Sequence, residues 1–150
     1  MKIKNTDFYE SDFIKTYSPN FNYLNINYIP ENILNSAYFL LYNLLQPIRN
    51  KFGEYIIINS FIRSSELNIK IRGSENSQHK NGEAVDISVS EFWKNGKRKT
   101  KKEYQESLFK LLAICQTQNY RQLIFYPKNN FIHISINSKD RSFKKQFIIN

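Results

Sequence analysis

Two short segments of this chain alternate between aliphatic and polar residues, and this pattern constrains the fold more than any other. Every second residue is aliphatic in residues 84–90 and again in residues 131–137. Successive side chains of a β-strand point to opposite faces, so each segment should bury one face and present a polar one. Asp86 and His133 fall on the polar faces. They can project from the same side if the two strands share one sheet.

The rest of the pattern predicts helices and further strands around this pair. A helix should begin at Pro30, bend or break at Pro47 and end at Gly53. The sequence therefore predicts an α+β fold with a small antiparallel sheet packed against helices. Its other predicted elements are a strand at 55–61, a helix capped by Ser64 and reaching Ile71, a polar loop at 73–81, a turn at 95–96, a helix at 103–118, and a strand at 122–126 that forms a hairpin with the one at 131–137.

The length of 150 residues suits one domain, 1–150, because no internal repeat or Gly/Ser/Pro-rich linker divides the chain. Residues 1–29 carry scattered aromatic residues, which predict an irregular wrap with short elements. No run reaches the roughly 18 apolar residues that a membrane helix needs. No apolar stretch follows Met1, so we expect no secretory signal. The single cysteine, Cys115, continues an apolar helical series and is expected to be a buried core thiol rather than a nucleophile.

The net charge of +9 favours anionic partners such as nucleic acid, an anionic cell-wall polymer or an acidic membrane surface. Basic residues are concentrated in 94–102 and 139–145. Runs of this kind are most often solvated, mobile segments. Aromatic residues are not interleaved with them as stacking platforms, so the pattern does not favour nucleic acid as a partner.

The chain contains two histidines, and His79 lies in the polar loop seven residues before Asp86. A loop residue at that distance can fold back over the polar face of the strand. Together with His133 this makes two imidazoles and one carboxylate, which leave one tetrahedral position for water, as in catalytic zinc sites. Spacing alone leaves open that His79 and Asp86 are ordinary polar surface residues.

Residues 77–86, Ser-Gln-His-Lys-Asn-Gly-Glu-Ala-Val-Asp, carry all five fixed positions of a Ser-x-His-x-x-Gly-x-Ala-x-Asp motif. This motif resembles that of the zinc D-Ala-D-Ala carboxypeptidase and L-Ala-D-Glu endopeptidase family (peptidase M15), which has the Hedgehog/DD-peptidase fold. Phe-Ile-His-Ile-Ser at 131–135 resembles the family's closing Trp-Val-His-x-Ser strand, with Phe for Trp. Residues 45–53, 59–68 and 122–125 resemble further family segments. The resemblance runs in the expected order from about residue 30 to 137.

The resemblance implies that His79, Asp86 and His133 bind zinc and that the substrate is a peptidoglycan peptide. It also implies that Arg63 binds a substrate carboxylate or carbonyl, for which its planar guanidinium is suited. Without the motif, Arg63 would be interpreted as part of a surface salt bridge. Ser77 is expected to shape the loop, since no base is paired with it.

The match fails where the family supplies a general base shortly before the last zinc ligand. Residues 125–132 contain no Asp, Glu or His. Tyr126 stands roughly where a Glu often follows the strand, and it could donate a proton or stabilise an oxyanion. Glu75 could fold in from the loop. Glu83 should face away from Asp86 if it belongs to the strand.

Two functions therefore stay open. The first is a zinc-dependent peptidase, a carboxypeptidase or endopeptidase that cuts peptidoglycan peptides. The alternative is a catalytically impaired member of the same fold, serving as a cell-wall-binding or structural virion module. Without a secretory signal we expect a phage endolysin in the host cytoplasm before its release, or a virion-associated protein with other virion proteins as partners. An intracellular bacterial protein is also consistent with the sequence.

Overall fold

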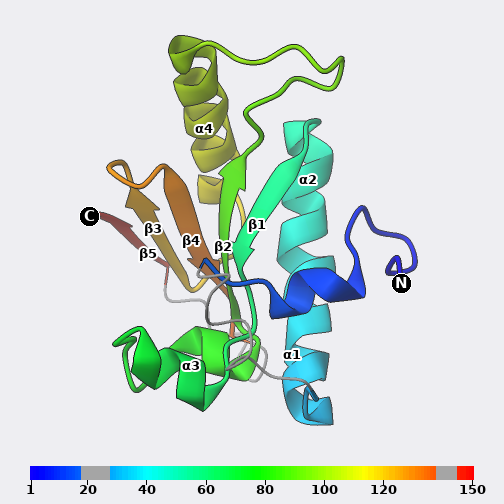
Figure 1. The fold of residues 1–150 in the computed structure, drawn as a ribbon, viewed down its shortest axis with the longest axis vertical. Coiled ribbons are helices and arrows are strands. Elements are labelled where there is room, and N and C mark those ends of the chain that lie inside the picture. The colour runs from blue at the N-terminus through cyan, green and yellow to red at the C-terminus, as the bar shows by residue number, and fades with distance from the viewer. Residues whose placement is uncertain (18–27, 138–144) are drawn as a thin grey trace.

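Five strands form one sheet in the order β1-β2-β4-β3-β5 (Figure 1). The structure is a computed structural model that describes residues 1–17, 28–137 and 145–150. The pairs β1–β2, β2–β4 and β4–β3 are antiparallel, as predicted. The strands are β1 (Ile56–Ser60), β2 (Ala84–Val89), β3 (Gln122–Tyr126), β4 (Phe131–Ser135) and β5 (Gln146–Ile149).

The fifth strand makes the sheet mixed, because β5 pairs parallel with β3. The sequence predicted only a basic tail here. Four residues are too few for a recognisable alternation, and pairing with β3 decides their conformation. Of the second basic group, Lys139, Arg141 and Lys144 lie outside the described residues.

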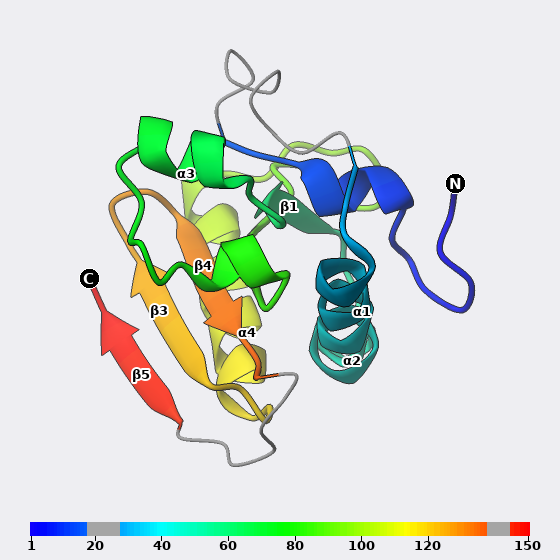
Figure 2. The same ribbon diagram turned by 90° about the horizontal axis from the view of Figure 1, so that it is seen from below.

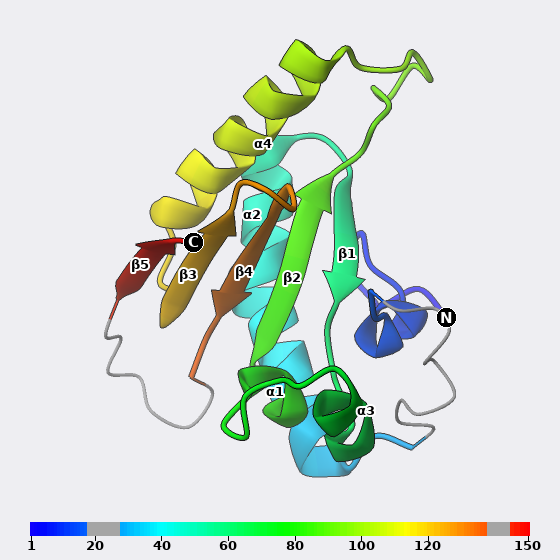
Figure 3. The same cartoon turned by 60° about the vertical axis from the view of Figure 1, so that its left-hand side comes forward.

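Helices cover one face of the sheet and enclose the core (Figure 3). They are α1 (Glu31–Leu40), the π turn η3 (Leu41–Leu45), α2 (Gln46–Phe52) and α4 (Lys101–Gln116). The aliphatic sides of β2 and β4 belong to this core, with Val85, Ile87, Ile132 and Ile134 fully buried. Cys115 is buried there too, as predicted, and its burial raises the pKa of the thiol to about 12. Among the described residues, no helix combines the length and apolarity needed to cross a membrane.

The break predicted at Pro47 is the π turn that joins α1 to α2. Proline lacks a backbone N–H, and its ring collides with the carbonyl four residues earlier, so a regular helix cannot continue through it. A wider turn relieves this conflict. The helix then ends at Gly53, whose φ of 76° lies in the left-handed region.

Short elements gather at one end of the sheet (Figure 2). Ser64 caps α3 (Ser65–Lys70) by accepting a hydrogen bond from the Leu67 amide. The loop after α3 contains the 3-10 helix η4 (Gln78–Asn81). Before the first strand, residues 1–17 form the predicted irregular wrap, with one 3-10 helix, η1 (Glu10–Ile14). Residues 18–27 of that wrap lie outside the described residues.

The basic loop before α4 is solvent-exposed at Lys94, Lys97 and Arg98, as its charge suggested, but not at Lys99. Lys99 is buried, pairs with Glu54 at 2.9 Å and lies 4.5 Å from the centre of the Trp93 ring. α4 also begins two residues before its predicted start, because Thr100 and Glu103 form a capping box.

Gly82 should tolerate no side chain, because its φ of 69° is left-handed and an added Cβ would lie 2.6 Å from the carbonyl oxygen of Ile33. Gly96 has a similar φ of 82° but nothing within 4 Å. Left-handed backbone costs a non-glycine residue about 1–3 kcal/mol. We expect Gly82→Ala to lower the free energy of unfolding by more than Gly96→Ala in urea titrations. Equal losses would show that the close approach to Ile33 has no energetic weight.

Candidate metal centre

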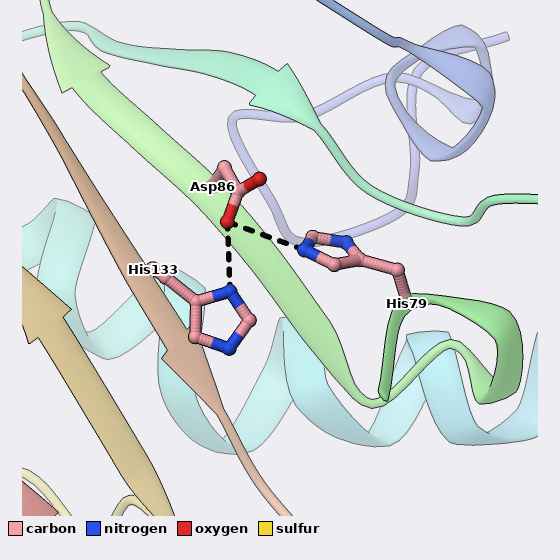
Figure 4. Close-up of side chains that lie close together, drawn as sticks. All are labelled: His79, Asp86 and His133. Atoms are coloured by element: carbon pink, nitrogen blue, oxygen red, sulfur yellow. Dashed lines mark hydrogen bonds and ion pairs between the residues drawn. The ribbon is translucent and has the colours of Figure 1, made fainter. Parts of the chain in front are cut away.

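Asp86 and His133 lie directly opposite each other on neighbouring strands. The register of β2 and β4 pairs Asp86 with His133, and both side chains project from the polar face of the sheet (Figure 4). His133 Nδ1 lies 2.8 Å from Asp86 Oδ1. The structure therefore confirms that the two strands share a sheet and that these residues project from the same side.

His79 reaches the same carboxylate from η4. Its Nε2 lies 3.2 Å from Asp86 Oδ1, and its Nδ1 lies 2.6 Å from the carbonyl oxygen of Phe61. A carbonyl oxygen only accepts hydrogen bonds, so Nδ1 carries the hydrogen and Nε2 of the neutral ring presents its lone pair to Asp86. The loop is held in this position by a hydrogen bond from the Arg63 amide to the His79 carbonyl, at 3.1 Å.

This arrangement fits a metal ion. A lone pair that faces a carboxylate is repelled unless a proton or a cation lies between them. The ligand atoms of His79, Asp86 and His133 all lie within 4.8 Å of one another. Ligand atoms on a tetrahedral zinc ion are about 3.3 Å apart, and three protein ligands leave the fourth position open. His133 Nε2 is buried and has no hydrogen-bond partner among the described residues.

Asp86 is held in its ionised form, which is the form that binds metals. When a proton rather than a metal lies between His79 Nε2 and the carboxylate, burial opposes ionisation of Asp86. The positive charge that His79 then carries and hydrogen bonds from both histidines outweigh it, so the pKa of Asp86 lies well below its usual range. A carboxylate with two imidazoles is a donor set that suits zinc.

Arg63 lies beside this carboxylate and is buried, so it does not belong to a surface salt bridge. Its Nη2 is 3.9 Å from Asp86 Oδ2 and donates to Ser60 Oγ at 3.3 Å, while Nη1 donates to Asn68 Oδ1 at 3.3 Å. Burial lowers the pKa of Arg63, and the Asp86 charge opposes that shift. Its Nε is buried without a hydrogen-bond partner among the described residues.

A groove of about 1150 Å³ opens beside His133. Tyr126 lines it and stacks on Phe131, with ring centres 4.4 Å apart. Glu75 and Glu83 also line it. β2 begins only at Ala84, so strand alternation does not govern the Glu83 side chain as the sequence had suggested. Further lining residues come from the loop 74–81 and from β3 and β5, including Ser77, Lys80, Gln122 and Gln146.

Two contributors to this site escaped sequence reasoning. The Phe61 carbonyl orients His79, but a backbone acceptor leaves no signature in residue type. Asn68 holds Arg63 and donates to the Ser74 carbonyl at 2.9 Å. The one signal for Asn68 in the sequence was that it belongs to the segment 59–68, which resembles the family.

Comparison with known families gives a match over most of the chain. The model of a family described as Peptidase M15 matches residues 21–135, well over half of the chain. The matched stretch contains His79, Asp86 and His133. The comparison with curated proteins gave no match.

Asp86→Asn should abolish stoichiometric zinc binding, because the amide removes the anionic ligand and leaves two imidazoles. We expect the unaltered protein to retain one zinc ion per chain after dialysis, measured by elemental analysis. Asp12→Asn is the matched control, since Asp12 is also buried but its carboxylate accepts from the Tyr9 amide and pairs with Lys15. Retention of zinc by Asp86→Asn would refute the assignment of this ligand.

Proposed function

The chain belongs to the M15 peptidase family, and we propose that it is a zinc-dependent peptidase that hydrolyses peptide bonds of bacterial cell-wall peptidoglycan. One observation carries the proposal: the convergence of His79, Asp86 and His133 on a common point at the edge of a groove. These residues would hold the zinc ion, which would supply Lewis-acid chemistry and lower the pKa of a bound water.

The chain's own residues would bind the substrate and stabilise charge. Arg63 places a positive charge beside Asp86, and a planar guanidinium there suits a substrate carboxylate or carbonyl oxygen. Tyr126 offers a phenol hydroxyl along the groove. Hydrolysis also needs a group that accepts and returns a proton. Glu75 and Glu83 are the acidic residues that line the groove, and we propose that this role falls to one of them.

The charges of the groove support a peptide substrate that carries both carboxylate and amino groups. Lys80 and Arg121 line it together with the two glutamates. Peptidoglycan stem peptides carry both kinds of group. A groove with cations and anions is complementary to such a peptide rather than to a uniformly charged polymer.

A second function is favoured by one specific observation, the lack of Asp, Glu or His in residues 125–132 before the last ligand. On that basis the alternative is a catalytically impaired module that binds cell wall or forms part of a virion. It would bind metal without hydrolysis, and a His79→Ala variant would leave assembly unaltered.

Incubation with purified peptidoglycan separates the two. The peptidase should release new amino and carboxyl termini, detectable by mass spectrometry. A chelator should abolish the release and added zinc should restore it. Asp86→Asn should be inactive, while Asp12→Asn should match the unaltered protein. Intact peptidoglycan after incubation with fully zinc-loaded protein would favour the non-catalytic module.

Arg63→Lys should lower kcat/KM by about 10- to 100-fold, because the loss of one charged hydrogen bond costs about 1.5–3 kcal/mol. Zinc content should not change. Arg49→Lys is the matched control, because Arg49 is also largely buried and its Nε lies 3.9 Å from the Asp7 carboxylate, away from the groove. Equal kcat/KM values for the two variants would exclude a substrate contact by Arg63.

A further inference from the structure

The N-terminal segment is hydrogen-bonded to Phe61 and Ile62, and Phe61 also contacts a proposed metal ligand. The Phe61 amide donates to the Lys15 carbonyl at 3.1 Å, and the Ile62 amide donates to the Phe13 carbonyl at 2.9 Å. The carbonyl of Phe61 is the group that orients His79. In Figure 1 the chain after η1 crosses in front of β1 towards β4. Tyr17 therefore follows Lys15 by two residues, and Lys15 is bonded to Phe61, the residue whose carbonyl orients His79.

The ring of Tyr17 extends an aromatic wall beside this site. It lies 5.2 Å from the ring of Phe131, which stacks on Tyr126. Phe131 precedes His133 by two residues on β4, so both project from the same face. Tyr126 in turn lines the groove. The three rings thus lie on the metal-binding face, where a bound peptide would contact them.

The hydroxyl of Tyr17 is oriented by Asn59. The Asn59 amide donates one hydrogen to Ser88 Oγ at 3.0 Å, and Ser88 follows Asp86 by two residues on the same face. Asn59 also makes a side-chain hydrogen bond to the phenol of Tyr17 that favours the ionised phenol, so the phenol oxygen is the acceptor. With that oxygen acting as acceptor, the hydrogen of the phenol is left for a further acceptor.

The phenol of Tyr17 is neutral at neutral pH even at the ordinary tyrosine pKa of about 10. Burial is the main cause that raises the pKa of its phenol above the ordinary value, and the negative charge of Asp86 adds to it against smaller opposing effects of Asn59 and Arg63. The residue as a whole is still 45% exposed, so a ligand can reach it. A neutral phenol in this position is a hydrogen-bond donor and not a base.

We propose that Tyr17 is a catalytic residue of this site, whose phenol donates a hydrogen bond to the carbonyl oxygen of the peptide bond under attack. That oxygen gains negative charge in the transition state, and donors aimed at it stabilise the charge. The inference rests on the proposed function and adds a residue that lies outside the family match, which begins at residue 21.

The test uses the zinc-loaded full chain and Tyr17→Phe, which keeps the ring and removes the hydroxyl. Its matched control is Tyr42→Phe, since Tyr42 is also 45% exposed and its hydroxyl donates to the Lys4 carbonyl, remote from the groove. The first readout is the calorimetric affinity for a phosphinic dipeptide, whose tetrahedral anion mimics the transition-state charge. The second is the separate determination of kcat and KM on a peptidoglycan peptide.

We expect Tyr17→Phe to weaken phosphinate binding at least about tenfold and to lower kcat about 10²- to 10³-fold, with KM and zinc content little changed. Tyr42→Phe should behave as the unaltered protein. Unchanged phosphinate affinity and kcat in Tyr17→Phe would overturn the role of Tyr17 and leave the proposed function intact. If the unaltered protein neither bound the phosphinate nor cut the peptide, the proposed function would fail and this inference with it.

Discussion

The buried carboxylate of Asp86 is the charge around which the rest of the site is organised. It is only 4% exposed, in the strand β2 near the middle of the sheet. A carboxylate removed from water is costly unless neighbouring groups balance it. The balancing groups come from separate elements: His133 from β4, His79 from η4, and Arg63 from the segment after β1. Strand register, loop conformation and the path after β1 are therefore all constrained by one negative charge.

Most of the strands and helices around the site could be predicted, because they follow from interactions between residues close together in the sequence. Alternation in residues 84–90 and 131–137 determines which side chains share a face, and a hairpin brings the second segment next to β3. Pro30 and Gly53 mark helix ends by their backbone geometry alone. The motif at 77–86 then added His79, which spacing by itself had left undecided.

The rest depends on contacts between distant parts of the chain, which leave little trace in sequence. β5 is a strand only because β3 offers it an edge. The Phe61 carbonyl orients His79 through a backbone atom that every residue type possesses. Tyr17 is one of many scattered aromatic residues in the N-terminal wrap, and only its packing on Phe131 distinguishes it. Glu83 was expected to face away from Asp86 if it belonged to the strand, but β2 begins one residue later and Glu83 lines the groove.

The X-ray absorption spectrum at the zinc edge shows directly whether two histidines and one carboxylate hold zinc with a fourth position open. We expect four nitrogen or oxygen neighbours of the zinc ion at about 2.0–2.2 Å. Outer-shell scattering should correspond to two imidazoles, and His79→Ala should reduce it to one. A sulfur neighbour at about 2.3 Å would contradict this ligand set, because Cys115 is buried in the core with a pKa raised to about 12. Imidazole scattering unchanged in His79→Ala would contradict it equally.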